Sequence, residues 1–221
     1  QFLVEAKILA GLAHPNLPRV IDTFFIPGKG QYLVMDFVGG EDLDEMLVRA
    51  AGQALPEARV LPWIRQVCEA LEYLHSQSPP IIHRDVKPAN IKITPEGRAI
   101  LVDFGLAKRY TPGTKTSAGA QAVTQGYSPC EQYGKGITDA RSDVYALGAT
   151  LYHLLTGVEP VESIQRIAHD PLLPAKSLNP AISPQVSSAI QRAMQVDPAL
   201  RFQNMAKFRA ALTQPKRLIP A

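Results

Sequence analysis

Four polar side chains suited to phosphoryl transfer lie close together near the middle of the chain. Residues 83–90 read HRDVKPAN and contribute Asp85, Lys87 and Asn90, while Asp103 follows a little further along. A carboxylate such as Asp85 can orient an attacking hydroxyl and accept its proton. Asn90 and Asp103 offer the hard oxygen ligands that Mg²⁺ prefers, and Lys87 offers a compact positive charge for the group in transfer. The sequence therefore predicts a phosphoryl-transfer site here.

The residues around these side chains predict the local structure that holds them. Residues 81–102 are β-branched in short runs and contain a Thr-Pro-Glu-Gly turn at 94–97, which indicates a β-turn-β unit. The alternative is a chance cluster of charged residues in a turn. Two motifs in the expected order on either side of such a unit make that alternative much the weaker one.

In this arrangement residues 83–90 resemble the catalytic loop of a protein kinase. Residues 103–105, which are Asp103, Phe104 and Gly105, resemble the metal-binding motif that opens the activation loop. The resemblance covers residues 1–213, and within the family the sequence looks most like the bacterial serine/threonine kinases. It implies transfer of the ATP γ-phosphoryl group to serine and threonine hydroxyls of protein substrates, with Mg²⁺ or Mn²⁺ as metal. Lys87 and Thr124 carry the serine/threonine assignment, and Thr124 is expected to lie near Asp85.

The resemblance also implies an α+β, bilobal fold with a mainly helical C-lobe and a partial N-lobe sheet. We expect residues 1–38 to form part of the N-lobe, residues 39–213 the C-lobe and residues 214–221 a linker or tail. Apolar spacing predicts helices and β-rich composition predicts strands at these positions: helices over 2–12, 56–76, 141–156, 184–196 and 204–212, and strands over 19–26 and 31–38.

Residues 32–38 resemble the strand and hinge that hold adenine in kinases. Met35 would be the gatekeeper, the Asp36 carbonyl and the Val38 amide would face the adenine edge, and Asp42 would approach the ribose. The alternative is that an apolar strand ending at a Gly-Gly pair is simply a core strand.

Further residues receive structural roles from the resemblance. Glu131 is expected to pair with Arg201, and Asp143 to bind the backbone of the catalytic loop. Glu5 resembles the helix glutamate that pairs with a strand lysine, although here it can equally be a solvated helix residue. An apolar column is expected to contain Leu9, Val20, His83 and Phe104.

The stretch 111–124 is polar and rich in small residues, as in a mobile loop. Arg84, with Lys108 or Arg109, is expected to hold a phosphate on this loop. The candidate acceptors are Thr111, Thr114, Thr116 and Ser117, and for any single one an unmodified hydroxyl is the simpler alternative. Self-association for autophosphorylation is a further implied interaction.

Three positions depart from the pattern of the family. Cys130 replaces a proline in the motif that closes the activation segment, and we expect it to be a neutral replacement. Lys92 stands where an apolar residue usually lies beneath adenine, so its stem is expected to pack there while the ammonium reaches outward. Ala89 offers no carboxylate for a basic substrate residue.

The 221 residues contain no glycine-rich phosphate loop and no strand lysine ahead of Glu5. We therefore expect this fragment to have little or no phosphotransferase activity alone, as a kinase domain truncated at its N-terminus. The alternative is a non-catalytic, pseudokinase-like binding or scaffold module. The intact set of Asp85, Lys87, Asn90 and Asp103 favours the enzyme.

Composition excludes several other classes of protein. The net charge is only +3, and hydrophobic residues make up 46% of the chain, so a buried core is expected and a nucleic-acid surface is not. No apolar run is long enough to span a membrane. Two cysteines, Cys68 and Cys130, do not make a disulfide framework and indicate a reducing compartment. We expect a cytoplasmic location, with membrane anchoring of the full-length protein through other segments.

Overall fold

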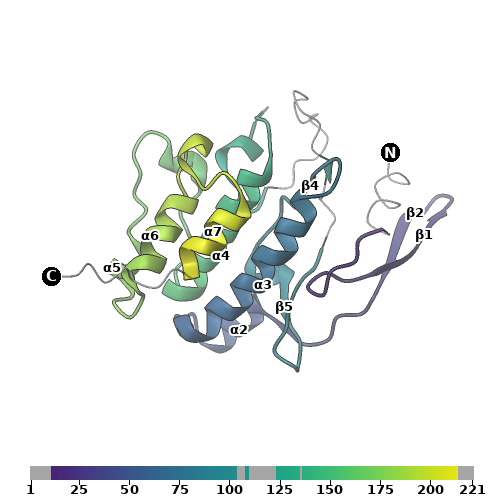
Figure 1. The fold of residues 1–221 in the computed structure, drawn as a ribbon, viewed down its shortest axis with the longest axis horizontal. Helices are drawn as coiled ribbons and strands as arrows, with labels where there is room; N and C mark the ends of the chain where they lie inside the picture. Colours follow the sequence, from purple (N-terminus) through teal and green to yellow (C-terminus); the bar gives the residue numbers. More distant parts are fainter. Residues whose placement is uncertain (1–10, 104–107, 110–122, 135, 214–221) are drawn as a thin grey trace.

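Six α-helices lie within the residues that the computed structural model describes, which are 11–103, 108–109, 123–134 and 136–213. Figure 1 shows α3, α4, α6 and α7 packed side by side. Their bounds are α2 Leu43–Arg49, α3 Glu57–His75, α4 Ala140–Thr156, α5 Ala175–Leu178, α6 Pro184–Ala193 and α7 Met205–Thr213. The long predicted helices are therefore present, with ends that differ from the prediction by at most three residues.

The helical core is centred on α4. Every residue from 142 to 155 is buried, as expected for a helix covered by neighbours on all sides. It ends at Gly157, which has a φ of +72°, a conformation that glycine adopts without strain. Beside it, α3 buries an apolar stripe that includes Val60, Ile64 and Leu71. The single tryptophan, Trp63, is buried on α3 beneath the guanidinium of Arg59, 5.2 Å from the ring centroid.

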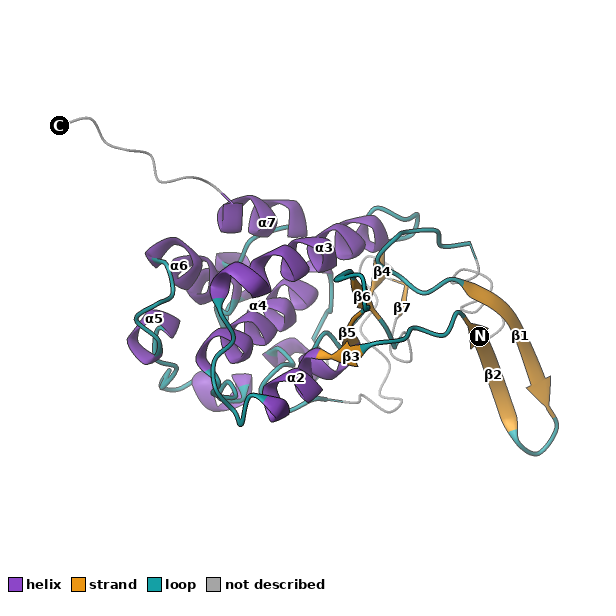
Figure 2. Ribbon diagram, turned by 90° about the horizontal axis from the view of Figure 1, so that it is seen from below, coloured by secondary structure: helices purple, strands orange, loops and turns teal. Residues whose placement is uncertain are grey.

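A two-stranded antiparallel hairpin, β1 (Val20–Ile26) and β2 (Gly30–Met35), extends away from the helices (Figure 2). Phe24 pairs with Tyr32 across the strands, and their rings stack with centroids 5.2 Å apart. The second strand ends at Met35, so the prediction that it continues to Val38 is wrong. The backbone N–H of Asp36 instead donates to the Arg19 carbonyl, 2.9 Å away, as the chain leaves the hairpin.

A small antiparallel sheet with the order β3-β5-β6 supports the predicted site. Its strands are β3 Glu41–Asp42, β5 Ile91–Ile93 and β6 Ala99–Leu101, and a separate pair joins β4 (Ile81–Ile82) to β7 (Lys108–Arg109). Ile91 and Ile93 are buried, while Lys92 between them is half-buried. The predicted β-turn-β unit is therefore present, and residues 83–90 lie between β4 and β5.

Two short helices, α2 and α5, were not predicted, and the helix expected over 2–12 lies almost wholly outside the described residues. Within the described part of the chain, no helix is both long enough and apolar enough to cross a membrane.

Candidate active site

The backbone of residues 83–84 is held by Asp143 on α4. Its carboxylate accepts hydrogen bonds from the N–H of His83 at 2.9 Å and the N–H of Arg84 at 2.8 Å. His75 Nε2, at the end of α3, lies 2.8 Å from the same carboxylate. Burial alone would raise the pKa of Asp143, but the hydrogen bond and charge of His75 outweigh it and the pKa is lowered. Asp143 therefore remains ionised and fixes the loop that precedes Asp85.

The carboxylate of Asp85 is the point at which the predicted catalytic residues meet. Thr124 Oγ1 donates to Asp85 Oδ1 at 2.7 Å, and Lys87 Nζ lies 2.9 Å from Oδ2. Asn90 Nδ2 donates to Oδ2 at 2.9 Å and to the Asp85 carbonyl at 2.7 Å. Lys87 Nζ also donates to Thr124 Oγ1 at 3.3 Å. The structure thus gathers four residues that lie up to 39 positions apart in sequence.

These contacts set the charge of Asp85. Burial alone would raise its pKa, but the hydrogen bonds from Lys87 and Thr124, with the Lys87 charge, lower it below the ordinary value. The side chain is therefore a carboxylate at neutral pH, the form that can accept a proton.

Asn90 directly precedes β5, and Asp103 follows the paired strand β6 by two residues. The N–H of Val102 donates to the Asn90 carbonyl at 2.9 Å, which holds the residue before Asp103 against Asn90. Asp103 is exposed and has a φ of +66°. An amide oxygen and a carboxylate are ligands suited to Mg²⁺, which usually completes its shell with water and substrate phosphates. Within the described residues, no group of three or more His, Cys, Asp or Glu side chains is placed to hold a metal. Asn90 and Asp103 offer two oxygen ligands of the kind that Mg²⁺ uses when water and substrate phosphates supply the rest.

His83 is buried beneath this site. Its Nε2 lies 3.3 Å from the Val102 carbonyl, and its Nδ1 accepts weakly from the Asp85 N–H at 3.4 Å. Burial lowers the pKa of His83. Val20 of the expected column is buried at the start of β1. Leu9, Phe104 and Gly105 lie outside the described residues, as does Glu5.

The residues predicted to bind the nucleotide lie along the connection from the hairpin to α2. Met35 ends β2, and Asp36 and Val38 line a cavity of about 720 Å³ together with residues from 12–19 and 94–100. Asp42 has a structural role that the sequence prediction missed. It begins α2 with a capping box, in which Asp42 Oδ1 accepts from the Glu45 N–H and the Glu45 carboxylate accepts from the Asp42 N–H, both at 2.9 Å.

Lys92 is the direct cross-strand partner of Asp42. Its ammonium lies 3.6 Å from Asp42 Oδ2, and both side chains are mostly buried. The Lys92 ammonium therefore points toward the Asp42 carboxylate on the same face of the sheet. Asp42 is the residue that was expected to approach the ribose.

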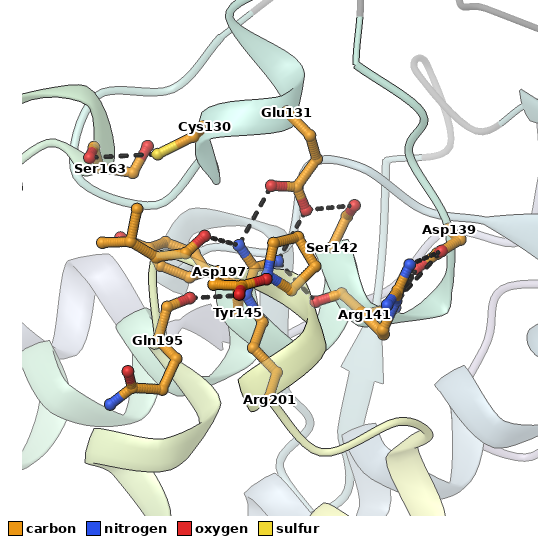
Figure 3. A network of polar contacts seen from close by, with 12 residues as sticks. Cys130, Glu131, Asp139, Arg141, Ser142, Tyr145, Ser163, Gln195, Asp197 and Arg201 are labelled. Carbon is orange, nitrogen blue, oxygen red and sulfur yellow. Dashed lines mark hydrogen bonds and ion pairs between the residues drawn. The ribbon is translucent and has the colours of Figure 1, made fainter. Parts of the chain in front are cut away.

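The segment that carries Thr124 runs on to a buried ion pair (Figure 3). The Glu131 carboxylate accepts hydrogen bonds from Arg201 Nη1 at 2.6 Å, from Arg201 Nη2 at 3.1 Å and from Ser142 Oγ at 2.8 Å. Arg201 is fully buried, and it also donates to the carbonyls of Gln195, Arg141 and Val196. Cys130 beside this pair donates to the Ser163 carbonyl at 3.2 Å.

Arg84 was expected to hold a phosphate on the activation loop. Its Nε is buried and has no hydrogen-bond partner among the residues that the structure describes. The candidate acceptors Thr111, Thr114, Thr116 and Ser117 lie outside the described residues, and nothing is described of the side chains of Lys108 and Arg109.

Three further contacts of this site were not predicted. They are the hydrogen bonds from Gln132 Nε2 to the Arg84 carbonyl at 2.8 Å, from Ser142 to Glu131, and between His75 and Asp143. They join residues that are 48, 11 and 68 positions apart in sequence. The only sequence signal for any of them is that Gln132 directly follows Glu131, which was predicted to belong to the site.

Comparison with known proteins agrees with this geometry. Residues 1–213 match the family described as the protein kinase domain. The chain is 34% identical to the serine/threonine-protein kinase PknB of Mycolicibacterium smegmatis and 36% identical to a probable serine/threonine-protein kinase of Corynebacterium efficiens. Each match covers 96% of this chain, but only 35% and 34%, respectively, of the relative. The chain thus spans about a third of the length of these curated relatives.

Solved structures agree on the fold. The apo form of PpkA-294 matches with a TM-score of 0.79 at 27% identity, covering 96% of this chain and 73% of that one. The kinase domain of Mycobacterium tuberculosis PknI matches with a TM-score of 0.75 at 29% identity, covering 96% and 76%. The predicted α+β kinase fold is confirmed.

Proposed function

The chain belongs to the protein kinase family, as a catalytic domain of the bacterial serine/threonine type, and from this premise we propose that it phosphorylates serine and threonine hydroxyls of proteins with ATP. The observation that carries the proposal is the convergence of Lys87, Asn90 and Thr124 on the carboxylate of Asp85. The intact set of Asp85, Lys87, Asn90 and Asp103 supports the enzyme over the alternative of a non-catalytic scaffold.

Asp85 is the residue that receives the substrate. Its ionised carboxylate orients the serine or threonine hydroxyl and accepts the hydroxyl proton. Thr124 and Lys87 fix the carboxylate in place, and the Lys87 ammonium also stabilises the negative charge of the group in transfer. Asn90 holds Asp85 through its amide nitrogen.

Asn90 and Asp103 are the residues that would hold Mg²⁺ or Mn²⁺, and Met35, Asp36, Val38 and Asp42 those that would hold the nucleotide. When bound, a metal–ATP complex supplies the γ-phosphoryl group and neutralises charge on the phosphates. At the position expected beneath adenine, Lys92 places a cation that is paired with Asp42, where the family usually has an apolar residue.

Arg84 is a receptor for a phosphate on the activation loop in this proposal. A buried guanidinium nitrogen without a partner among the described residues is suited to a charge-assisted hydrogen bond with a phosphorylated Thr111, Thr114, Thr116 or Ser117. Protein substrates, and a second copy during autophosphorylation, are the proposed partners.

The first experiment tests the role of Asp85. In protein expressed from the complete gene, Asp85→Asn should lower phosphate transfer from labelled ATP to a serine- or threonine-containing substrate by about 10²–10⁴-fold. ATP binding and thermal unfolding should stay close to those of the wild type. Asp22→Asn, on the exposed hairpin, is the matched control and should keep full activity. Equal activity of the two variants would contradict the proposal.

A further inference from the structure

The backbone at Arg84 is held in an unfavourable conformation directly before Asp85. Its φ is +71°, in the left-handed region that side-chain-bearing residues rarely adopt. Such conformations persist only when the surrounding structure fixes them from more than one side. Asp143 supplies one side, through the hydrogen bond from the Arg84 N–H at 2.8 Å.

The other side is supplied by Gln132. Its Nε2 donates to the Arg84 carbonyl at 2.8 Å. That carbonyl belongs to the peptide joining Arg84 to Asp85, so this bond fixes the plane from which the Asp85 side chain departs. Asp143 and Gln132 thus hold the two peptides that flank Arg84.

Gln132 is itself held firmly. It ends the 3₁₀ helix η2 (Cys130–Gln132) and is only 6% exposed. The residue before it, Glu131, is bound by the buried Arg201 and by Ser142 of α4 (Figure 3). η2 is therefore anchored to the helical core on one side and to the catalytic loop on the other.

The same segment touches the catalytic loop at a second point. Thr124 donates to the Asp85 carboxylate at 2.7 Å, eight residues before Gln132 in the sequence. The segment 124–132 therefore holds Asp85 by its side chain at one end and by its backbone at the other.

Two unsatisfied atoms indicate that Gln132 is not present simply to stabilise the core. Gln132 Oε1 and Arg84 Nε are both buried without a hydrogen-bond partner among the described residues. The unpaired Oε1 costs free energy on burial and offsets part of what the hydrogen bond from Nε2 contributes to folding.

We infer that Gln132 is a positioning residue for Asp85, which couples the end of the activation segment to the catalytic loop. This inference rests on the proposed function in one respect, the assignment of Asp85 as the residue that accepts the proton. Gln132 acts through the Arg84 carbonyl and does not contact the substrate.

The test compares Gln132→Met, which keeps the shape but cannot donate, with Gln125→Met, an exposed glutamine of the same segment. In protein from the complete gene, Q132M should lower kcat about tenfold, the equivalent of one lost hydrogen bond of about 1.4 kcal/mol. KM for ATP should not change, the thermal midpoint should fall only slightly because the Arg84 carbonyl loses one donor, and Q125M should match the wild type. A kcat of Q132M within twofold of the wild type, or a KM for ATP that rises as kcat falls, would overturn the inference.

Gln132→Glu adds a readout that a packing role would not move. A carboxylate cannot donate to the Arg84 carbonyl, but a protonated carboxyl can. The activity of Q132E relative to the wild type should therefore rise as the pH is lowered, while that of Q132M stays constant. Parallel pH profiles for the two variants count against the inference.

Hydrogen exchange separates failure of this inference from failure of the proposed function. In the 221-residue chain, Q132M should speed amide exchange within residues 83–87 about tenfold and leave α4 unchanged. Faster exchange at residues 83–87 supports the positioning role whether or not the wild type transfers phosphate. A wild type from the complete gene that transfers no phosphate would contradict only the proposed function. Unchanged exchange at 83–87 would refute the positioning role.

Discussion

Arg201 shows how a single buried side chain can join distant parts of the fold. Its five N–H groups match five acceptors, which are the two carboxylate oxygens of Glu131 and three backbone carbonyls. Its guanidinium also lies 4.9 Å from the centroid of the Tyr145 ring. A buried ion pair is stabilising only when both partners are present and their remaining groups are satisfied, a condition that Arg201 meets.

The residue-scale prediction compares this pair with one at the surface. Arg201→Met should lower the free energy of unfolding by about 3–5 kcal/mol, because it leaves the Glu131 carboxylate buried and unpaired. Arg209→Met removes a partly exposed pair with Glu69 and Glu72 and should cost at most about 1 kcal/mol. Urea unfolding of the two variants measures both values. Similar losses would show that burial does not set the strength of these pairs.

At the scale of elements, the end of α4 depends on Gly157. An added Cβ there would overlap the carbonyl oxygen of Gly52, and the φ of +72° is already unfavourable for alanine. Gly28 in the hairpin turn has nearly the same φ, +75°, but nothing lies within 4 Å of an added Cβ.

These two glycines make a matched pair of substitutions. Gly28→Ala should cost about 1 kcal/mol, which is the conformational penalty alone. Gly157→Ala should cost clearly more, because backbone atoms must also move. Thermal or urea unfolding provides the comparison, and equal costs for the two variants would mean that the contact with Gly52 relaxes freely.

The elements also show what sequence reasoning can and cannot reach. α3 and α4 were predicted because apolar spacing and, for α4, Gly157 mark them. α2 was missed although Asp42 and Glu45 form a capping box three residues apart, a local signal that was available. α5, at four residues, is too short to show a period.

In the site, too, the features that a local sequence motif marks were predicted and those that depend on packing were not. The residues that meet at Asp85 were predicted because they stand in recognisable linear motifs. The contacts of Gln132 with Arg84, and of Lys92 with Asp42, depend on how separate strands and segments pack. No single stretch of sequence carries that information, so the structure was needed to find them.

At the scale of the whole molecule, stability should depend on buried histidines. Burial lowers the pKa of both His83 and His153, although nearby carboxylates act in the opposite direction. In the unfolded chain these side chains take up protons below about pH 6.5, while the folded chain resists doing so. The stabilisation from the neutral histidines is therefore present above about pH 6.5 and is lost as the pH falls below it.

The expected slope is up to about 1.4 kcal/mol per pH unit for each of the two histidines. Urea unfolding between about pH 5 and pH 8 measures it. His153→Gln should reduce the slope, because one of the two groups is removed. Asp143, whose pKa is also lowered, contributes only in a more acidic window, below about pH 4. A stability that does not change between pH 5 and 6.5 would contradict this account.

The position of the only tryptophan has an optical consequence. Trp63 is buried on α3 against Arg59, whereas the β1–β2 hairpin extends away from the helices (Figure 2). Its intrinsic fluorescence therefore reports on the environment of the helical core, whereas circular dichroism averages over strands and helices alike. A melting curve recorded by fluorescence describes α3 and its neighbours, and any difference from the dichroism curve measures how independently the hairpin unfolds.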